Sequence, residues 1–272
     1  MTRGYRPNLR PRGNASKQPI ENLKPCISWA GGKSRLLKFI LPLIPEHRCY
    51  AEPFGGGLAV FLAKPRSPVE AINDINADLV NFYRVARFHP EALAAELKLA
   101  LHSREDFYAY RQQPGLTDIQ RAARWFFVNK ESFGGGLDSF GISPASGPCS
   151  LLARIPRLAE LSARLDKVYI ENLDWRKFLS LYDRKETFFF LDPPYVGCGA
   201  SNYQPWSMET VGELRDVLFR LKGKWLLTLN DAVEIRSLFA DCTVRPVERA
   251  NGINHRTQKN PIYREIIITP PD

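Results

Sequence analysis

A carboxylate, two prolines and a tyrosine follow directly after a short run of apolar residues. The run is Phe188 to Leu191, and the tetrapeptide after it is Asp192-Pro193-Pro194-Tyr195. Such a run predicts a buried strand, and the carboxyl ends of strands are where open α/β sheets bind ligands. Proline fixes its backbone angle and lacks an N–H. We therefore expect this tetrapeptide to be a rigid group that binds or acts on a ligand, and a purely structural Pro-Pro turn is the alternative.

The chemistry of these four residues suits a planar aromatic amine. Asp192 can accept a hydrogen bond from an exocyclic amine, and Pro193 and Pro194 direct an adjacent carbonyl as a second acceptor. Tyr195 offers a ring against which a planar group can stack. Two acceptors polarise the amine nitrogen, so its lone pair can attack an electrophile. A nucleobase inside a duplex would first have to be flipped out to reach such a site.

A glycine cluster and a distant acid could bind a second ligand. Gly55-Gly56-Gly57 follows a short predicted strand, and glycine allows backbone to approach a ligand closely. Asp74 lies 19 residues beyond Gly55, near the spacing at which an acid binds ribose hydroxyls in nucleotide-binding α/β folds. The GxGxxG spacing is absent, so a plain tight turn is the alternative interpretation.

A second glycine turn is similar to the end of a P-loop. The sequence Gly32-Lys33-Ser34 fits, but the glycine that a P-loop requires five residues before its second glycine is Ile27. A P-loop ATPase is therefore not expected. Trp29 offers a flat face for a purine or a sulfonium cation, and Lys33 is either a ligand contact or a solvated residue at a helix start.

The elements that must position these residues alternate between strands and helices. The order predicts an α/β fold with a doubly wound, mostly parallel sheet. Expected strands or strand-and-loop segments lie at 26–33, 49–52, 69–74, 168–171, 188–191, 224–231 and twice in the C-terminal region, around a basic loop. Expected helices lie at 36–44, from 77, at 91–110, at 120–130, on both sides of 168–171, and at 208–222.

Composition divides the chain into three parts. Residues 1–23 form a basic, Pro- and Gly-rich tail that we expect to be disordered. Residues 24–88 and 166–272 carry the predicted sheet. Residues 89–165 carry helices broken by the glycine-rich stretch 133–148, which predicts an inserted, mainly helical domain.

The formal net charge is +9, from 38 basic and 29 acidic residues, which favours a polyanionic partner. Residues 1–24 contain six basic residues and one acid, a net charge of +5, and either lie on phosphates or are solvated without a role. The tail shows neither a secretory h-region nor a transit-peptide pattern, and we expect no membrane span. Five scattered cysteines without a CxxC pair argue against a disulfide framework and a zinc site, and favour a reducing cytoplasm.

Four motifs in this order resemble the Dam-like, D12 class of DNA adenine-N6 methyltransferases: WAGGK (29–33), EPFGGG (52–57), DINADL (74–79) and DPPY (192–195). The resemblance covers nearly all of the expected sheet domain. It implies a SAM-dependent methyltransferase fold in which the inserted helical domain recognises the target. It also implies S-adenosylmethionine as methyl donor, no metal, and a flipped adenine in double-stranded DNA as acceptor. We expect a monomer or weak dimer in the cytoplasm, associated with the nucleoid through DNA, and a cognate restriction endonuclease is one partner that the family allows.

By position, the resemblance assigns the chemistry and the donor to particular residues. The catalytic residues would be Asp192, Pro193, Pro194 and Tyr195. The cofactor-binding residues would be Trp29, Lys33, Glu52, Phe54, Gly55, Gly57, Asp74 and Asp192. Asn230-Asp231 match a strand-end segment of the same core.

The middle block matches the family less well. WFFVNKESFGGGL (125–137) is similar to a helix and loop that enter DNA, but the family's Asn-Gly-Leu turn is Gly135-Gly136-Leu137 here, and Asp138 stands where a basic residue is expected. The candidate DNA contacts are Lys130, Ser132, Phe133, Tyr203, Asn251, Asn254, His255, Arg256 and Lys259. A solvated loop is the alternative for each, and Arg256 and Lys259 suit phosphate contacts better than base readout.

Three other functions remain open on the sequence. They are the same chemistry on cytosine N4, the same chemistry on RNA, and a non-catalytic DNA-binding protein with this fold. The acid at the head of the DPPY motif favours adenine, since cytosine-N4 enzymes often place serine there.

Overall fold

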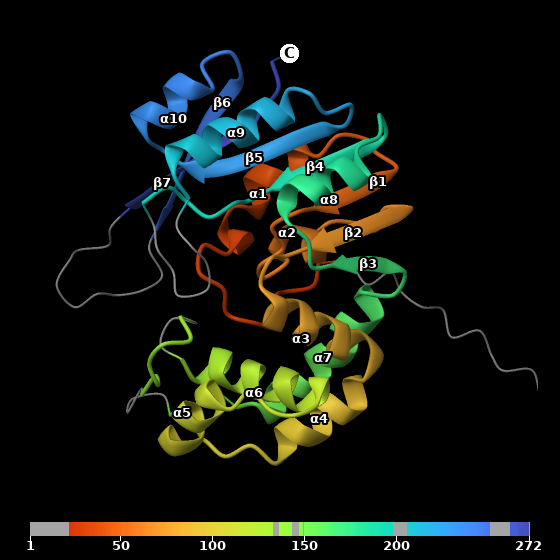
Figure 1. The fold of residues 1–272 in the computed structure, drawn as a ribbon, viewed down its shortest axis with the longest axis vertical. Helices are drawn as coiled ribbons and strands as arrows, with labels where there is room; N and C mark the ends of the chain where they lie inside the picture. The colour runs from red at the N-terminus through yellow and green to blue at the C-terminus, as the bar shows by residue number, and fades with distance from the viewer. Residues whose placement is uncertain are drawn as a thin grey trace, which may run out of the picture.

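A seven-stranded mixed sheet lies at the centre of the computed structural model (Figure 1). The structure describes residues 22–132, 136–142, 147–148, 150–197, 206–250 and 262–271. The strand order is β3-β2-β1-β4-β5-β7-β6. The strands are β1 (Cys49–Glu52), β2 (Val69–Asn73), β3 (Val168–Glu171), β4 (Thr187–Leu191), β5 (Lys224–Asn230), β6 (Thr243–Ala250) and β7 (Ile262–Thr269). The five strands from β3 to β5 run parallel, whereas β7 pairs antiparallel with β5 and β6. The expected α/β class is confirmed, with an antiparallel pair at one edge.

The apolar strand β4 shows why both faces of this sheet are covered. All five of its residues are buried. Phe188 and Phe190 pack into one apolar cluster, and Phe189 and Leu191 pack into another on the opposite face. Successive side chains of a strand point to opposite faces, so a strand that is buried on both sides must be apolar throughout.

Helices cover the two faces separately. The Phe188 face packs on α1 (Leu37–Ile40), α2 (Ala59–Ala63) and α3 (Ala77–Phe88), and the Phe189 face packs on α8 (Trp175–Tyr182), α9 (Met208–Leu218) and α10 (Val233–Leu238). Short 3₁₀ turns, η1 (Lys33–Arg35) and η2 (Leu41–Leu43), flank α1. Helix α10 was not expected from the sequence.

A second group of helices lies beyond the β3 edge, at the lower end of Figure 1. It consists of α4 (Pro90–Lys98), α5 (Arg104–Gln112), α6 (Asp118–Glu131) and α7 (Ile155–Arg164), with a 3₁₀ turn, η4 (Leu152–Arg154), before α7. Helix α3 joins the group to the sheet, because α6 and α7 both pack on it. The rings of Phe82 in α3 and Phe126 in α6 are stacked, with centroids 5.3 Å apart.

Three predictions about local structure were wrong. The expected helix at 91–110 is two helices, since the Ser103 side chain accepts from Asp106 N and starts α5 anew. The expected helix at 36–44 is only a short α1 between two 3₁₀ turns, and Pro42 provides no N–H for a continuous ladder.

The third error concerns the strand expected near Ser28, where the structure has no strand. Its backbone pairs with a side chain instead of with another strand. Asn129, a fully buried residue of α6, accepts from Ser28 N at 2.9 Å and donates to Ser28 O at 2.7 Å. The segment before Lys33 is therefore held by the helical group rather than by the sheet.

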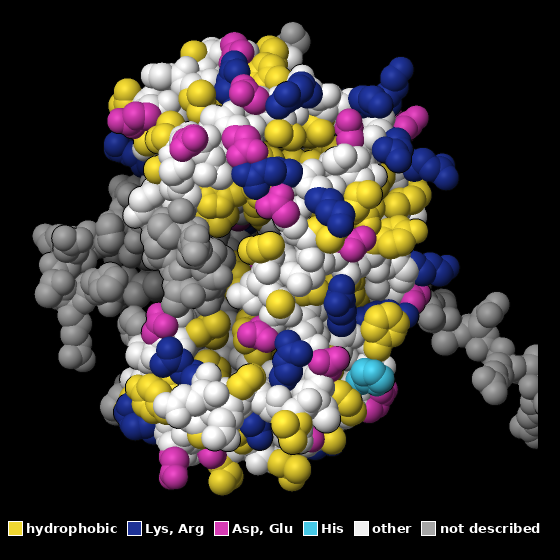
Figure 2. All heavy atoms as spheres, viewed as in Figure 1, with side chains coloured by type: hydrophobic (Ala, Val, Ile, Leu, Met, Phe, Trp, Pro, Cys, Tyr) yellow, Lys and Arg dark blue, Asp and Glu magenta, His cyan; other side chains and the backbone are white. Residues whose placement is uncertain are grey.

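The described surface carries charges of both signs. Figure 2 shows Lys and Arg interspersed with Asp and Glu on the face in view, over the sheet part and the helical part alike. Among the described residues, no helix combines the length and the apolar character that crossing a bilayer requires.

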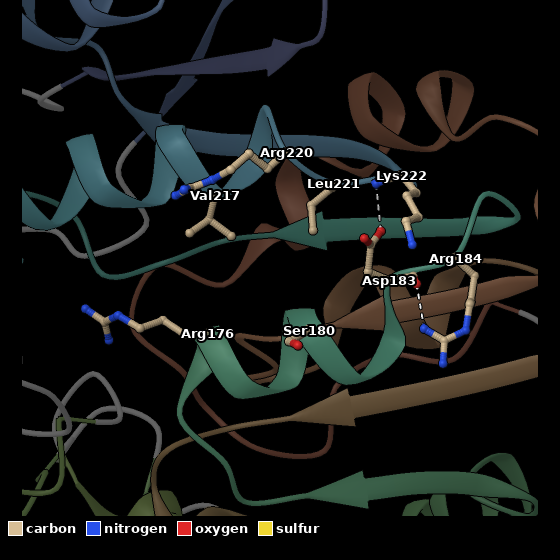
Figure 3. Close-up of a pocket in the computed structure, with 8 residues that line it drawn as sticks. All are labelled: Arg176, Ser180, Asp183, Arg184, Val217, Arg220, Leu221 and Lys222. Atoms are coloured by element: carbon tan, nitrogen blue, oxygen red, sulfur yellow. Dashed lines mark hydrogen bonds between the residues drawn. The ribbon is translucent and has the colours of Figure 1, made fainter.

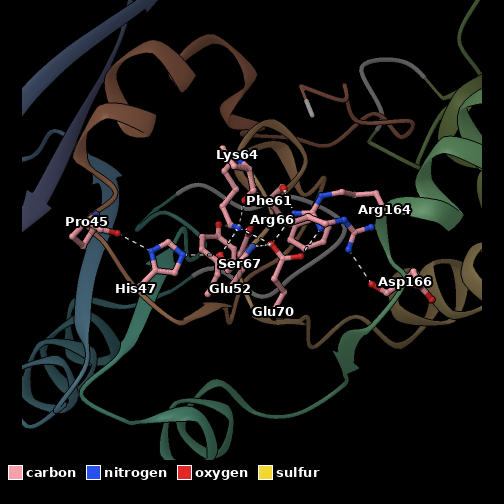
Figure 4. A network of polar contacts seen from close by, with 12 residues as sticks. Pro45, His47, Glu52, Phe61, Lys64, Arg66, Ser67, Glu70, Arg164 and Asp166 are labelled. Carbon is pink, nitrogen blue, oxygen red and sulfur yellow. Dashed lines mark hydrogen bonds and ion pairs between the residues drawn. The ribbon is translucent and has the colours of Figure 1, made fainter. Parts of the chain in front are cut away.

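A buried ionic cluster joins the end of α7 to β2 (Figure 4). Arg164, which is fully buried, donates to both carboxylate oxygens of Glu70 and to Phe61 O at 2.8 Å. Lys64 Nζ lies 2.6 Å from Glu70 Oε1. Burial opposes the ionisation of Glu70, but the Arg164 and Lys64 contacts outweigh burial and lower its pKa. The cluster fixes the helical group to the sheet through charge.

Replacing Arg164 by Ala should lower the free energy of unfolding by about 3–5 kcal/mol, because it leaves the Glu70 carboxylate buried beside a single cation. Urea unfolding measures the change. The control is Arg121→Ala, which removes half-exposed ion pairs with Asp78 and Asp118 and should cost less than about 1 kcal/mol. An equal, small loss for both variants would show that the cluster does not stabilise the fold.

Candidate active site

Polar side chains collect on one face of the sheet, where β1, β4 and β5 end. Glu52 lies two residues after Tyr50, and Asp192 lies two residues after Phe190. Because alternate side chains of a strand share a face, both acids lie on the face where Tyr50 and Phe190 are buried. Thr228 of β5 lies beside Asp192, and the antiparallel strand β7 contributes Glu265. The acids thus gather at the carboxyl ends of the parallel strands, where α/β folds bind ligands. We call this end of the sheet, with Glu52, Asp192 and Glu265, the acidic edge.

Lys33 is the cation that balances these acids. Its side chain is only 4% exposed, and its Nζ lies 2.7 Å from Asp192 Oδ2 and 3.6 Å from Glu265 Oε2. The same Nζ donates to Gly31 O at 2.8 Å. Asp192 Oδ1 accepts from Thr228 Oγ1 at 2.8 Å. The carboxylate of the DPPY motif is therefore held in a fixed orientation from two sides.

Burial raises the pKa of Asp192, and Lys33 opposes that rise through its charge and its hydrogen bond. Thr228 also lowers the pKa by donating to the carboxylate, whereas the negative charge of Glu265 raises it. Lys33 therefore favours the ionised form of Asp192 against the effect of burial.

Tyr195 is fixed by the same group of residues. Its hydroxyl donates to Glu265 Oε2 at 2.5 Å, and Lys33 Nζ lies 4.9 Å from the centroid of its ring. Of the other two predicted catalytic residues, Pro193 is buried and Pro194 is partly exposed. All four residues of the motif lie at the carboxyl end of β4, as predicted.

Glu265 and Thr228 were missed in the sequence. Glu265 is 1% exposed and Thr228 is fully buried. The sequence did contain a signal for Glu265, which is a lone acid in the apolar strand REIIIT. Acids are rarely buried unless they are paired, so a polar partner in the interior could have been expected.

The glycine cluster and Asp74 contact each other directly, through backbone N–H groups that donate to the carboxylate. Gly56 N donates to Asp74 Oδ2 at 2.9 Å, and Asn76 N donates to Oδ1 at 2.9 Å. Gly55 N donates to Asn73 O at 2.7 Å. Burial raises the pKa of Asp74 to about 6, while the backbone N–H donors act in the opposite direction. Loop and acid form one unit, and the role of Asp74 toward a ribose stays a prediction.

Trp29 lies directly on the glycine loop. A Cβ atom placed on Gly56 would come within 2.4 Å of the indole Nε1, and one on Gly57 within 3.2 Å of the Trp29 Cβ. Gly56 also has a φ of +45°, which favours glycine. The packing thus requires glycine at Gly56 and brings together two motifs that lie more than twenty residues apart.

Glu52 and Phe54 occupy the end of β1. Glu52 is 2% exposed and accepts from the Tyr50 hydroxyl at 2.7 Å. Burial raises the pKa of Glu52 to about 8, and the charge of Asp192 contributes. Phe54 packs edge-on against Trp206, with centroids 5.3 Å apart, and near Trp175 at 6.5 Å. The aromatic ring therefore lies among other rings at the same edge of the sheet.

The residues just after β3 bind the residues at the end of β2, where Asp74 lies. The sequence did not indicate this contact. Leu173 N donates to Asn73 Oδ1 at 2.8 Å, and Asn73 Nδ2 donates back to Leu173 O at 3.0 Å. Asn172 Nδ2 donates to Asp74 O at 2.8 Å. An asparagine directly after a predicted strand was the signal that could have pointed to this contact.

The predicted DNA contacts are described only in part. Lys130 Nζ donates to Ser28 Oγ at 3.3 Å and lies 5.6 Å from the Phe126 ring centroid. Ser132 is 9% exposed, and its hydroxyl donates to Asn129 O at 3.1 Å, so it shapes the end of α6 in this conformation. Asp138 pairs with Arg111 at 3.6 Å. Phe133, Tyr203, Asn251, Asn254, His255, Arg256 and Lys259 lie outside the described residues.

A hollow of about 430 Å³ lies elsewhere, where α8 and α9 end. Figure 3 shows its lining, which is made by Arg176, Ser180, Asp183, Arg184, Val217, Arg220, Leu221 and Lys222. Asp183 accepts from the N–H groups of Lys222 and Gly223, just before β5 starts. The hollow is therefore at the amino ends of the strands, opposite the acidic edge. In the part of the chain that the structure describes, no group of three His, Cys, Asp or Glu side chains could hold a metal ion.

Comparison with known proteins gives a consistent match. The family model of D12 class N6 adenine-specific DNA methyltransferases matches residues 29–253. The chain is 27% identical to the type II methyltransferase M1.LlaDCHI of Lactococcus lactis subsp. cremoris, over 91% of this chain and 95% of that protein. It is 29% identical to the DNA adenine methylase of Haemophilus influenzae, over 95% of this chain and 97% of that protein.

Replacing Gly56 by Ala should lower the free energy of unfolding by about 2–4 kcal/mol, because the methyl group meets Trp29 and the backbone angle is strained. Gly212→Ala is the control, since Gly212 lies within α9 and a Cβ atom placed on it would meet no other atom within 4 Å. That change should stabilise the protein by about 0.5–1 kcal/mol. Urea unfolding compares the two, and a neutral Gly56 variant would contradict the packing argument.

Proposed function

The chain belongs to the D12 class of N6 adenine-specific DNA methyltransferases, and we propose that it transfers a methyl group from S-adenosylmethionine to an adenine flipped out of double-stranded DNA. The observation that supports this most directly is the fixed Asp192 carboxylate. It lies at the carboxyl end of β4 and is held by Lys33 and Thr228. Tyr195, with its own anchor on Glu265, stands beside it.

The residues at the acidic edge fit a cationic methyl donor. S-adenosylmethionine, when bound, supplies a methyl group activated by a positively charged sulfur. Desolvation raises the pKa values of Glu52 and Asp74, which are buried, and of Asp192, which is partly exposed. A nearby cation favours their ionised forms. Gly55 keeps the glycine loop close to the end of β2, since a Cβ there would lie 3.0 Å from Asn73 O. We propose that Trp29, Lys33, Glu52, Phe54, Gly55, Gly57, Asp74 and Asp192 form the donor side.

The DPPY residues would bind the adenine amine. Asp192 already accepts two hydrogen bonds, and a carboxylate has about four acceptor positions, so it can accept a further N–H. Pro193 and Pro194 fix the backbone carbonyl that serves as the second acceptor. The Tyr195 ring would stack on the base. Lys33 acts through Asp192 in this proposal, because its ammonium keeps that carboxylate ionised.

We propose direct transfer, with no covalent intermediate on the protein. Because the methyl group is already activated, the protein contributes alignment of the amine and electrostatic stabilisation. As the amine nitrogen forms its bond to the methyl carbon, the bond from that carbon to sulfur would break and leave a neutral thioether. The amine would lose one proton, and we propose Asp192 as the carboxylate that receives it. No other side chain of the four-residue motif can do this at neutral pH.

The helical group would recognise the target. Residues 89–165 contain α4 to α7. Lys130 lies near the end of α6, within the segment 125–137 that resembles the family's DNA-entering helix and loop. We propose a catalytic domain of 24–88 and 166–272, and a basic tail at 1–23 that contacts phosphates. The substrate places this activity in the cytoplasm with the DNA.

Incubation of the purified chain with labelled S-adenosylmethionine and double-stranded DNA, followed by nucleoside mass spectrometry, tests the proposal. The expected product is N6-methyladenine. N4-methylcytosine as the product would show that the acceptor is cytosine, and methylation of RNA alone would show that the acceptor is RNA. Binding of DNA without any methylated product would indicate a non-catalytic protein.

Asp192→Ala should reduce kcat by about a hundredfold or more, because it removes an acceptor needed in the transition state, while the protein stays folded and retains part of its donor binding. The rate of N6-methyladenine formation and calorimetric donor binding measure the two effects. Asp216→Ala, which removes an exposed carboxylate, is the control and should be fully active. Wild-type rates in Asp192→Ala would show that this carboxylate is not catalytic.

Lys33→Met should shift the acid limb of the rate profile toward higher pH. The pKa of Asp192 is raised by burial and lowered by Lys33, so removing Lys33 raises it further. The negative charges of Glu52 and Glu265, the other acids near Asp192, also raise the pKa of Asp192. Activity needs the ionised form and is lost as pH falls through the pKa, so the loss begins at a higher pH. An unshifted profile of kcat against pH would contradict the assigned role of Lys33.

A further inference from the structure

We propose that Glu265 is a positioning residue for the methyl transfer: it fixes the ring of Tyr195 and the ammonium of Lys33 in place, so the DPPY motif has its active geometry before the ligands bind. This inference rests on the proposed function. It assigns a task to a strand, β7, that none of the four sequence motifs includes.

The contacts of Glu265 reach both ends of the DPPY motif. One oxygen, Oε2, accepts from the Tyr195 hydroxyl at 2.5 Å and lies 3.6 Å from Lys33 Nζ. The same Nζ lies 2.7 Å from Asp192 Oδ2. Glu265 is therefore connected to the last residue of the motif directly, and to the first residue through Lys33.

The position of Glu265 within the sheet is rigid. It is 1% exposed and stands opposite Asn230 in the antiparallel pairing of β5 and β7. Its strand neighbour, Ile266, is fully buried on the other face of the sheet. A residue held by ladder hydrogen bonds and packing can define a geometry more accurately than a loop residue.

Charge explains why this position should be an acid. A buried tyrosine hydroxyl needs a hydrogen-bond partner, and a carboxylate acceptor makes the bond shorter and stronger than a neutral one. The Lys33 ammonium lies near two carboxylates, at 2.7 Å from Asp192 Oδ2 and 3.6 Å from Glu265 Oε2, so Glu265 also contributes to its position. Without Glu265, the Tyr195 hydroxyl would lose this hydrogen bond, and Asp192 would be the carboxylate left beside Lys33.

The end of β5 offers a further polar group beside this anchor. The Oδ1 atom of Asn230 is buried and has no hydrogen-bond partner among the described residues. It stands across the strand pair from Glu265. A buried acceptor without a donor is costly, so this part of the edge can accept a donor group that binding brings in.

Two substitutions separate charge from hydrogen bonding. Glu265→Gln keeps an oxygen that can accept from Tyr195 but removes the charge, whereas Glu265→Leu removes both. We expect kcat for N6-methyladenine formation to fall by several-fold in the Gln variant and by about tenfold or more in the Leu variant. The dissociation constant of S-adenosylmethionine, measured by calorimetry, should change by less than about threefold.

Tyr195→Phe and the double variant Tyr195→Phe/Glu265→Gln complete a double-mutant cycle. If the two residues act as a unit, the effects on kcat and on the unfolding equilibrium constant will be non-additive. Glu248→Gln is the control, since Glu248 lies on the neighbouring strand, is exposed and pairs with Arg264. It should match the wild type in every measurement.

Each outcome bears on one proposal. Wild-type kcat in both Glu265 variants, or additive effects in the cycle, would overturn the role of Glu265. A loss of activity that is explained wholly by a smaller folded fraction would also overturn it, because a structural residue should not alter kcat per folded molecule. If the wild-type chain makes no methylated product, the proposed function fails, and the unfolding cycle still decides whether Tyr195 and Glu265 are coupled.

Discussion

The ion pair between Lys33 and Asp192 is the interaction on which the rest of the site depends. A carboxylate at the end of a buried strand is unfavourable in its ionised form, because burial removes it from water. An ammonium at 2.7 Å opposes this effect and favours the ionised form. Thr228 then fixes the second carboxylate oxygen, so charge and orientation are both set before any ligand arrives. The geometry of the DPPY motif is therefore tied to the position of Lys33.

The position of Lys33 is in turn set by the helical group. The segment that leads to it makes no strand, and its backbone is bound at Ser28 by the buried amide of Asn129 in α6. Trp29, between the two, lies on the glycine loop. Helices that we propose to recognise the target thus hold the segment that carries the ammonium beside Asp192. This short segment is one connection between the two parts of the chain.

A second connection runs through the interior of the sheet. Arg164, at the end of α7, pairs with Glu70 on β2, and Lys64 pairs with the same carboxylate. The Lys64 ammonium also lies 4.3 Å from the ring centroid of Tyr50, whose hydroxyl donates to Glu52. Polar groups therefore extend from the helical group to the acidic edge of the sheet. Because partly satisfied buried networks are costly, this arrangement favours one relative placement of the two parts.

The sequence by itself determined the α/β class, the four motifs and the placement of the DPPY motif at the carboxyl end of a buried strand. Strand ends, glycines and prolines act locally, and the parallel order brings their carboxyl ends to one edge whatever the loops do. Only the tertiary structure decided which groups surround Asp192. Glu265 lies on an antiparallel strand 73 residues after it, and Asn129 replaces the expected strand pairing at Ser28. Such contacts join distant segments through side-chain geometry, which neither periodicity nor motif spacing encodes.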